Sequence, residues 1–572
     1  MTDTKTHSAD LAPVVCFALT ACLFVWRAAP GVSFEDSGEL AAATVSLGVA
    51  HPPGYPLQML SGYVWQSLVT PMVGDAARAL NLFSAIAAAA AAGLLSWFAR
   101  RSGASFGAAL ASGLLLALAP TFAAQAVIVE VYALAALLQV GLLVSSLSPG
   151  PARPTRTLLL FGLALCAHPN SLVLAPLPLF TLWRAWRESE SGSVRMLATS
   201  AASFLAGLSL YAYVPLRAVS DPAVNWGEAS GGARLADHLL RTQYRTGLER
   251  AYENQFSLLA EQLAGQWPLL FGLLAASLFV CRARIPGRLV AQVLLCVAFA
   301  SAALFYAVNW PLEDELSRAR VAGSYGPLVI TVCAVGSLAL IGIERAVGSR
   351  IPANLRSYFL PIAVVLLAQP FGPTTFEGQL DQRGRDWAQS YADEVLAACP
   401  QNSVLVVSKL GYGDDLTFPL IYSQVANAVR PDVLVLSREF MVHDWFRDQL
   451  GRREPWLAEA LDRLSTRFES ETANISDPRS RRILTASFFP KLYDLAGGEA
   501  RPVVFVARPG ERILGGRTIQ AGPVLWHLSS LAAFDAGLRA APSGFDWLPA
   551  DRSDPILRML LELAEQRERA RL

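Results

Sequence analysis

The stretch SFEDSGELAAATVSLGVAHPPGYP (residues 33–56) places an acidic cluster directly after an apolar segment that is about as long as a bilayer is thick. Glu35, Asp36 and Glu39 form the cluster, and small residues separate it from His51 and a Pro-Pro-Gly turn. The many Ala, Gly and Leu residues predict an interfacial helix along the membrane surface. Asp36 has two compatible interpretations. It caps this helix, with Glu39 completing a capping box, or it is a general base at the level of the lipid headgroups.

The composition indicates a membrane protein. The chain has 572 residues, of which 53% are hydrophobic and 16% are charged, whereas soluble domains average about 25% charged residues. The net charge of +1 argues against nucleic-acid binding, which needs a concentrated basic patch. The seven cysteines are dispersed and form no CxxC or Cys/His cluster. We therefore expect no structural zinc site.

Eleven apolar segments are candidate membrane spans, because a span needs about 20 mostly apolar residues. They are residues 11–29, 80–99, 104–120, 122–147, 157–168, 170–184, 196–216, 267–281, 289–309, 323–343 and 357–372. We expect the first to be retained rather than removed as a signal peptide, since no clear cleavage site follows it. The two short segments beside His168 are expected to form a hairpin that turns at this residue.

The basic residues predict the orientation of the chain. Arg and Lys favour the cytoplasmic side of a membrane, and the basic clusters between the candidate spans share one side only if the chain turns at His168. The pattern predicts a multi-pass protein of the inner (plasma) membrane with a cytoplasmic N-terminus. The segments expected on the outer side are a first loop at 30–79, the loops 217–266 and 310–321, and everything after about residue 373.

The character of the sequence changes after residue 372. Between residues 402 and 440 a short β-branched run, a turn rich in Gly and Asp, a helical stretch and a second β-branched run follow one another. This is a strand–helix–strand pattern, and about 200 residues suffice for a separate core. We expect a helical membrane module at 1–372 and an exported α/β domain at 373–572, which ends in an amphipathic helix.

Four motifs resemble those of a known family of membrane enzymes. They are EDSGELAAATVSLGVAHPPGYPL (35–57), VEVYAL (129–134), VPLRAVSDPAVNWG (214–227) and GDDLTFPLIYSQVANAVRPDVLVL (413–436). The family is glycosyltransferase family 117, the relatives of the eukaryotic transmembrane protein O-mannosyltransferases that act on plexin-type domains. The resemblance implies a GT-C bundle, here of about 11 spans, with its active site away from the cytoplasm. It also implies a polyprenyl-phosphate sugar donor and a catalytic acidic residue at Asp36, with Glu35 as the second choice.

A donor of this kind predicts an arginine beside its phosphate. The leaving group develops negative charge, and a guanidinium fork binds it bidentately. The candidates are Arg217, Arg318 and Arg320, and each is equally consistent with an anchor at the membrane interface. Glu130 and Tyr132 lie in an apolar run, where an ionisable side chain either lines a functional cavity or forms a hydrogen bond between helices.

Further polar residues complete a predicted pocket for the donor and the acceptor. Its members are Glu39, His51, Glu130, Tyr132, His168, Asn225 and Trp226. Besides Glu39 and Glu130, whose structural alternatives are given above, three of them have structural alternatives. These are a loop residue stacked by prolines for His51, a turn residue for His168 and an interfacial anchor for Trp226.

In the C-terminal part, Asp414 and Asp415 are candidates for binding an acceptor or a cation. The alternative is a solvated turn that caps a helix at Thr417. Two carboxylates without a third ligand are a weak metal signal. We expect no required metal, with a divalent cation as the alternative.

These features together predict an inverting glycosyltransferase. It moves a sugar, with mannose favoured, from a polyprenyl-phosphate carrier to a Ser or Thr hydroxyl of an exported protein, and Asp36 is the base. A cell-surface glycan or lipid is the alternative acceptor. Two other classes are weaker: a transporter, whose site would lie near the midplane of the membrane, and a non-catalytic anchor for residues 373–572. The predicted partners are membrane lipid, the lipid-linked sugar and the acceptor protein, without nucleic acid.

Overall fold

The computed structural model describes most of the chain. The described residues are 11–147, 153–188, 194–244, 323–347, 351–352, 355–367, 380–407, 413–472, 485–509, 511–514, 517–521, 525–528, 548 and 555–571. Some predictions lie outside these residues. They are the spans 267–281 and 289–309, the loop 310–321 with Arg318 and Arg320, and the loop 217–266 beyond residue 244.

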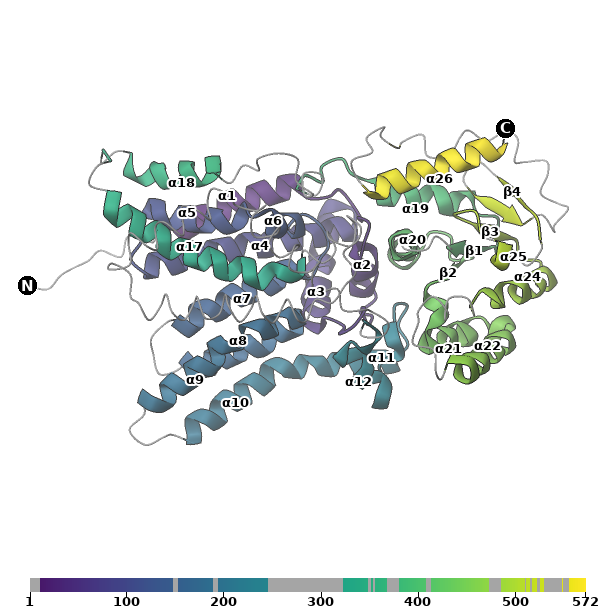
Figure 1. Cartoon of the computed structure of the whole chain (residues 1–572), viewed down its shortest axis with the longest axis horizontal. Coiled ribbons are helices and arrows are strands. Elements are labelled where there is room, and N and C mark those ends of the chain that lie inside the picture. The colour runs from purple at the N-terminus through teal and green to yellow at the C-terminus, as the bar shows by residue number, and fades with distance from the viewer. Residues whose placement is uncertain are drawn as a thin grey trace, which may run out of the picture.

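The N-terminal part of the chain is a bundle of helices with broadly similar directions (Figure 1). Its helices are α1 (Leu11–Arg27), α3 (Pro56–Val73), α4 (Ala76–Arg101), α5 (Phe106–Ala117), α6 (Pro120–Gln125), α7 (Tyr132–Leu147), α8 (Arg153–Ala167), α9 (Pro176–Glu188), α10 (Val194–Leu208), α17 (Gly326–Val347) and α18 (Arg356–Leu367). Helix α4 packs against α1, α3, α5 and α7, which places it at the centre of the bundle. Its long run of alanines lets the neighbouring backbones approach closely.

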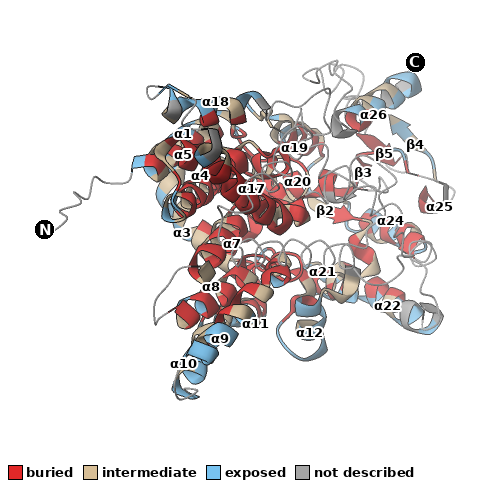
Figure 2. Cartoon of the chain, turned by 60° about the vertical axis from the view of Figure 1, so that its left-hand side comes forward, coloured by how far each residue is buried: buried red, intermediate tan, exposed pale blue. Residues whose placement is uncertain are grey.

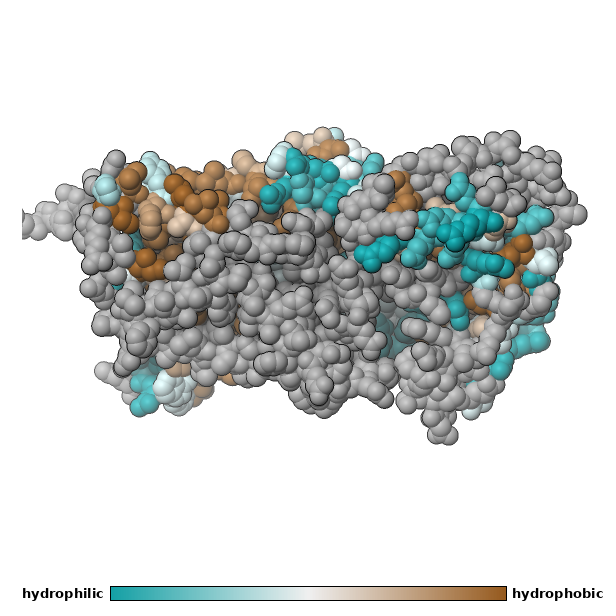
Figure 3. All heavy atoms as spheres, turned by 45° about the horizontal axis from the view of Figure 1, so that its top comes forward, coloured by the Kyte–Doolittle hydropathy of each residue, from teal (hydrophilic) through white to brown (hydrophobic). Residues whose placement is uncertain are grey.

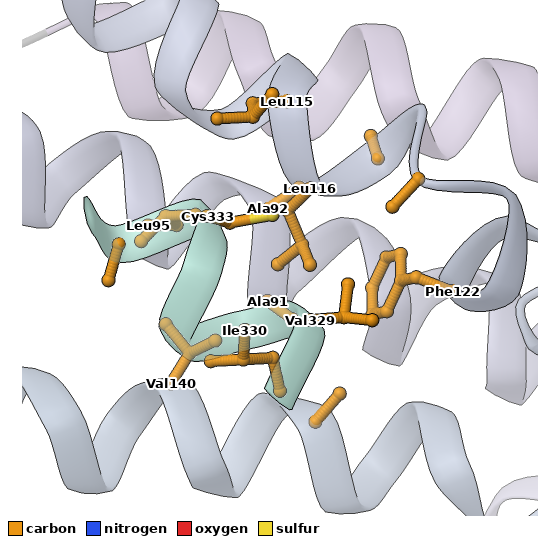
Figure 4. Close-up of a cluster of buried hydrophobic side chains, with 14 of the residues drawn as sticks. Ala91, Ala92, Leu95, Leu115, Leu116, Phe122, Val140, Val329, Ile330 and Cys333 are labelled. Carbon is orange, nitrogen blue, oxygen red and sulfur yellow. The ribbon is translucent and has the colours of Figure 1, made fainter. Parts of the chain in front are cut away.

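The core of the bundle is apolar and closely packed. Figure 4 shows side chains from α4, α5, α6, α7 and α17 meeting in one cluster. The labelled residues are Ala91, Ala92, Leu95, Leu115, Leu116, Phe122, Val140, Val329, Ile330 and Cys333. The buried residues concentrate around α4 and α17, whereas α9 and α10 are largely exposed (Figure 2).

Among the described residues, three helical segments are long and apolar enough to cross a membrane: Ala76–Arg101, Val194–Val219 and Gly323–Arg345. Shorter apolar helices occupy Leu11–Arg27, Phe106–Ala117, Tyr132–Leu147 and Ser357–Leu366. On the face seen in Figure 3, hydrophobic residues gather over the bundle and hydrophilic ones over the C-terminal domain. This distribution agrees with a helical membrane module that carries a water-exposed domain.

Two helical segments differ from the predictions. The predicted span 122–147 is broken, because α6 ends at Gln125 and α7 begins only at Tyr132. The first loop, predicted at 30–79, contains the 18-residue helix α3, whose Leu68 and Met72 are exposed apolar residues. The predicted turn at His168 is present, because α8 ends at Ala167 and a 3-10 helix begins two residues later, at Pro169.

Short elements lie between the bundle and the C-terminal domain (Figure 1). They are α2 (Ser37–Val45), the 3-10 helices η1 (Pro169–Leu174), η2 (Ser209–Ala212), η3 (Trp226–Glu228), η4 (Thr242–Tyr244) and η5 (Gly323–Tyr325), and helices α11 (Tyr213–Val219) and α12 (Gly232–Leu240). Helix α2 packs on both the bundle and helix α20 of the C-terminal domain. The acidic cluster therefore lies at the junction of the two parts.

The C-terminal domain is an α/β structure with a five-stranded sheet in the order β2-β1-β3-β5-β4. Strands β2, β1 and β3 are parallel, whereas β5 is antiparallel to both β3 and β4. Its elements are α19 (Trp387–Ala398), β1 (Val404–Val407), α20 (Gly413–Asn427), β2 (Leu434–Ser437), η7 (Phe440–Val442), α21 (Asp444–Arg453), η8 (Pro455–Leu457), α22 (Ala458–Thr472), α24 (Phe488–Gly498), β3 (Val503–Phe505), α25 (Glu511–Leu514), β4 (Ile519–Ala521), β5 (Trp526–Leu528) and α26 (Pro555–Arg571). The strand–helix–strand pattern of the sequence corresponds to β1, α20 and β2.

Candidate active site

Asp36 directly precedes helix α2, but its side chain does not cap this helix. Its backbone is α-helical, with φ −72° and ψ −9°, and its carboxylate accepts no hydrogen bond from the first turn. Glu39 does not reach back to the helix start, because its carboxylate binds His51 instead. The predicted capping box is therefore wrong, and the first turn of α2 leaves Asp36 available for another role.

Glu39 and His51 form a buried pair. The backbone N–H of His51 donates to Glu39 Oε1 over 2.9 Å, and His51 Nδ1 lies 2.9 Å from Oε2. Only 2% of the Glu39 side chain and 11% of the His51 side chain are exposed. A carboxylate that binds both the backbone and the ring of one residue fixes the position and the rotamer of that ring.

The second ring nitrogen of His51 faces Tyr55 and Asp36. Nε2 lies 2.9 Å from the Tyr55 hydroxyl and 3.8 Å from Asp36 Oδ2. Burial disfavours the charged form of His51, but the nearby Asp36 and Glu39 carboxylates outweigh it and raise the pKa of His51 to about 9. The carboxylates at the two ring nitrogens thus favour the imidazolium form of His51, while burial also raises the pKa of Glu39.

Asp36 differs from its neighbours in exposure. Its side chain is 48% exposed, while Glu39 and His51 beside it are buried. Glu35 adopts a left-handed backbone conformation with φ 60°, so the chain turns sharply just before Asp36. The result is an accessible carboxylate supported by buried residues, which is the arrangement that a general base requires.

Glu130, Tyr132 and His168 lie next to this cluster. Glu130 is buried in the connection between α6 and α7, and its Oε2 accepts the Val131 N–H over 3.1 Å. Burial, reinforced by the charges of Asp36 and Glu35, raises the pKa of Glu130 well above its usual range. The ring of His168 stacks on that of Tyr55, with 5.5 Å between the ring centroids, and lies 4.9 Å from that of Tyr132 by the same measure.

The same ring of His168 also closes a local turn. Its Nδ1 accepts the N–H of Asn170 over 3.0 Å, so the side chain caps helix η1. His168 thus fulfils the predicted turn role and contacts the candidate pocket as well.

Arg217 is close to α2 but faces its backbone. Its Nε donates to the Leu47 carbonyl over 2.6 Å and its Nη2 to the Ser46 carbonyl over 3.4 Å. These carbonyls follow the last turn of α2, where cationic side chains stabilise a helix end. A structural role thus accounts for the contacts of Arg217 with the described residues.

A different arginine has a long-range effect on the site. The positive charge of Arg241, at the C-terminus of α12, is among the influences that lower the pKa of His168, after burial, and it also opposes the protonation of His51. Both imidazoles are thus within electrostatic reach of this guanidinium. Arg241 is not among the residues predicted from the sequence, because it follows an ordinary amphipathic helix without a recognisable motif.

His238, from the same helix, is buried against the loop that carries His51. A Cβ on Gly54 would lie 3.2 Å from its Nε2, and one on Gly227 would lie 2.9 Å from its Nδ1. Both glycines have positive φ, which a side chain would also disfavour. Neither ring nitrogen has a hydrogen-bond partner among the described residues, and burial, followed by the charge of His51, lowers the pKa of His238 to about 3.

Asn225 and Trp226 lie beside the loop that carries His51. The Asn225 amide donates to the Ala218 carbonyl and to Asp221 Oδ1, each over 3.1 Å, so this side chain holds its own loop together. The Trp226 ring lies edge-on to His51, with 6.0 Å between the ring centroids. Trp226 is therefore a wall of the candidate site and not an exposed interfacial anchor.

Asp415 belongs to helix α20, which packs on α2. It is fully buried within helix α20, which begins at Gly413, so the predicted solvated turn before Thr417 is wrong. The structure does not describe the side chain of Asp414. Within the described part of the chain, no group of three His, Cys, Asp or Glu residues is arranged to hold a metal ion.

Comparisons with known proteins show what this chain is similar to. A family model described as the protein O-mannosyl-transferase TMEM260 N-terminal domain matches residues 36–192, and a second, described as TMEM260-associated domain 2, matches residues 388–467. The chain is similar to the TMEM260 proteins in both of these regions. It is 26% identical to the mouse protein O-mannosyl-transferase TMEM260 over 476 residues, which cover 77% of this chain and 64% of the mouse protein. This confirms the resemblance inferred from the four motifs.

A TMEM260 relative from Dictyostelium discoideum is 23% identical over 484 residues, which cover 76% of this chain and 58% of that protein. The chain thus spans about three fifths of the length of these relatives. Among solved structures, ArnT from Cupriavidus metallidurans resembles it weakly. The apo form has 14% identity and a TM-score of 0.49, covering 91% of this chain and 98% of ArnT. The form bound to undecaprenyl phosphate has 15% identity and a TM-score of 0.44, covering 75% and 90%.

The two TMEM260 matches divide the candidate site. Asp36, Glu39 and His51 fall in the first, whereas the C-terminal helices α20 and α21 fall in the second. Tyr55 is not among the predicted site residues, although it belongs to the same motif as His51 and follows it by four residues. The residues from α11, η3 and α12 lie between the two matched regions.

Proposed function

We propose that this chain is an inverting glycosyltransferase, which moves a sugar from a polyprenyl-phosphate carrier to a Ser or Thr hydroxyl of a protein. The observation that carries the proposal is the exposed carboxylate of Asp36, supported by the buried Glu39–His51 pair at the junction of the two parts of the chain. The relatives named protein O-mannosyl-transferases support mannose as the sugar and a protein as the acceptor.

The reaction is a single displacement in which Asp36 takes the proton of the acceptor hydroxyl. The oxygen then forms a bond to the anomeric carbon of the sugar, while the bond from this carbon to the phosphate oxygen breaks. The polyprenyl phosphate departs with the electron pair of that bond. A positioned carboxylate base contributes about 10²–10⁴-fold to such a step.

His51 keeps Asp36 in place and balances the local charge. Its Nε2 faces Asp36 at 3.8 Å, while Glu39 holds the opposite side of the ring. Without a cation the carboxylates at this site would repel a donor that is itself an anion. The imidazolium of His51 therefore lets an anionic phosphate approach the base.

We assign the phosphate contact to Arg241, because it follows helix α12, whose His238 lies against Gly54 of the His51 loop, and because its charge acts on the imidazoles of the site. Arg217 is the second candidate, and it would first have to leave the carbonyls of Ser46 and Leu47. Arg318 and Arg320 remain predictions outside the described residues. The phosphate is a single group that one arginine can bind bidentately, so the proposal requires no metal.

The location of the site explains the choice of donor. In the proposed orientation the N-terminus is cytoplasmic and the C-terminal α/β domain is outside the plasma membrane, as the basic residues predict. Nucleotide sugars are not supplied there, so the sugar arrives on a lipid. A base at the edge of an apolar bundle meets such a donor at the membrane surface.

The test is transfer by the purified full chain in lipid nanodiscs. Polyprenyl phosphates that carry mannose, glucose or N-acetylglucosamine are offered with a panel of exported proteins, and intact-mass spectrometry detects the product. We expect a mass increase of one hexose on a protein from the mannose donor, with and without EDTA. Transfer only to a glycan or lipid would replace the acceptor, and no transfer from any lipid donor would contradict the proposed function.

A further inference from the structure

We infer that the C-terminal α/β domain is a working part of the active site, because it positions His51 through the segment 221–228. This inference rests on the proposed function. The domain contributes positioning residues, chiefly Trp445 and Gln449, that need not touch the substrate. Three sets of contacts support it.

The first set joins the segment 221–228 to the loop that carries His51. The Val49 N–H donates to the Val224 carbonyl over 2.8 Å, and the Trp226 N–H donates to the Val49 carbonyl over 3.0 Å. The two segments thus form a short parallel bridge. His51 is only two residues beyond Val49, so a shift of the segment 221–228 also shifts the ring of His51.

The second set fixes Trp226 on the C-terminal domain. Its ring contacts Phe440 at 5.1 Å, Trp445 at 5.4 Å and Phe418 at 6.2 Å between centroids. All four rings are buried and form a separate apolar cluster. The ring of Trp226 also lies 6.0 Å from that of His51, measured between the centroids. The C-terminal domain therefore holds the aromatic wall of the site from behind.

The third set is polar and comes from helix α21. Gln449 donates to the Asn225 carbonyl, and Arg452 forms an ion pair with the nearly buried Glu228. Arg453 pairs with Asp221 at 3.0 Å. One face of α21 thus binds both ends of the segment 221–228.

The backbone of this segment needs such support. Asp221 has φ 43° and Glu228 has φ 45°, which are left-handed conformations that cost non-glycine residues about 1–3 kcal/mol each. Conformations of this kind persist only where the surroundings hold them. Among the described residues, α21 provides ionic contacts to both.

Helix α2 is fixed by the same domain. A Cβ on Gly38 would lie 2.5 Å from the Phe418 carbonyl carbon, so the backbones of α2 and α20 touch at this glycine. The Tyr422 hydroxyl lies 2.8 Å from Asp75 Oδ2 and accepts the Ala77 N–H over 2.9 Å. The C-terminal domain is therefore built against both sides of the Glu39–His51 pair.

The test loosens this support without changing a residue at the reaction centre. In Trp445→Ala, we expect kcat to fall about 10- to 100-fold, since a displacement of about 1 Å can cost that much. Trp445→Phe should restore most of the rate, because it keeps an aromatic contact to Trp226. The control is Arg517→Gln, which removes an ion pair with Asp494 of α24 on the far side of the domain (Figure 1).

A second readout does not depend on turnover. NMR of the ¹³C-histidine-labelled full chain, with the His51 signal assigned through His51→Gln, gives the pKa of His51. In Trp445→Ala this pKa should fall from about 9 towards its ordinary value, because the displaced ring leaves Glu39. Should Trp445→Ala fail to fold, Gln449→Met removes one hydrogen bond at nearly constant volume and should shift the pKa in the same direction.

The outcomes separate the two proposals. If the wild-type chain transfers no sugar but Trp445→Ala still shifts the pKa of His51, the proposed function fails and the positioning stands. If the wild-type chain transfers sugar, while Trp445→Ala and Gln449→Met match it in kcat and in the pKa of His51, the positioning is overturned. Equal losses in Trp445→Ala and the Arg517→Gln control would also overturn it, since they would show a general effect on the domain.

Discussion

The Glu39 carboxylate holds His51 by two hydrogen bonds, one to the backbone N–H and one to Nδ1, each 2.9 Å long. This relationship organises the candidate site, because it turns the other ring nitrogen towards Asp36 and Tyr55. Two members of the acidic cluster therefore differ in their surroundings. Glu39 is buried and holds His51, whereas Asp36 is accessible.

The first prediction concerns the alkaline limit of activity. Because the pKa of His51 is raised to about 9, transfer should be highest below that pH and decline above it. Glu39→Gln removes the charge that favours the imidazolium, so the limit should move to lower pH by about 1–3 units. The measurement is kcat against pH for both proteins. An unchanged limit in Glu39→Gln would show that His51 does not govern it.

The same pair affects stability. A raised folded-state pKa means that the stabilisation by His51 is complete below its ordinary pKa of about 6.5 and is lost as the pH rises through about 9. The thermal midpoint of the wild-type chain should therefore decrease as the pH rises from about 6.5 to about 9. The thermal midpoint of Glu39→Gln should depend less on pH over this range. Parallel profiles for the two proteins would contradict the buried ion pair.

His238 should have the opposite effect, at acid pH. The pKa of His238 is lowered to about 3 in the folded chain. Below about pH 6.5 the unfolded chain therefore binds a proton at this residue, whereas the folded chain does not. Stability should decline as the pH falls from that value towards 3, and His238→Gln should reduce the decline. Thermal midpoints at pH 7 and pH 5 measure this, and an equal drop in both proteins would refute it.

Arg241 and Arg217, the two described candidates for the phosphate contact, should differ in the effects of their substitution. Arg241→Gln should lower kcat about 10²–10³-fold if this residue binds the departing phosphate, with little change in the thermal midpoint. Arg217→Gln should mainly lower the thermal midpoint, since it removes hydrogen bonds to the end of α2. The reverse pattern, with a stable but inactive Arg217→Gln, would return the phosphate contact to Arg217.

The sequence predicted the helical membrane module and the strand–helix–strand unit, because each depends on local pattern. The catalytic role of Asp36 stays a prediction. The sequence did not predict contacts between residues that are far apart along the chain. The capping box was a reasonable reading of the spacing between Asp36 and Glu39, but the preferred partner of Glu39 lies 12 residues away at His51. Asp415 seemed solvated because its burial comes from tertiary packing.

The contacts of the segment 221–228 were beyond prediction for the same reason. Gln449 and Asn225 are 224 residues apart in the sequence, and neither belongs to a motif that names the other. Arg241 and His238 were missed because a single charged or imidazole side chain on an amphipathic helix is ordinary. Only the fold brings them to the His51 loop.

Sugar transfer by Asp36→Asn tests the central claim, that Asp36 is the base, most directly. The substitution keeps the size of the side chain and removes its ability to take a proton. Glu35→Gln is the matched control. Turnover per molecule of monodisperse protein should fall about 10²–10⁴-fold in Asp36→Asn, with an unchanged thermal midpoint and a smaller loss in Glu35→Gln. A stable Asp36→Asn protein with near-wild-type turnover would contradict the claim.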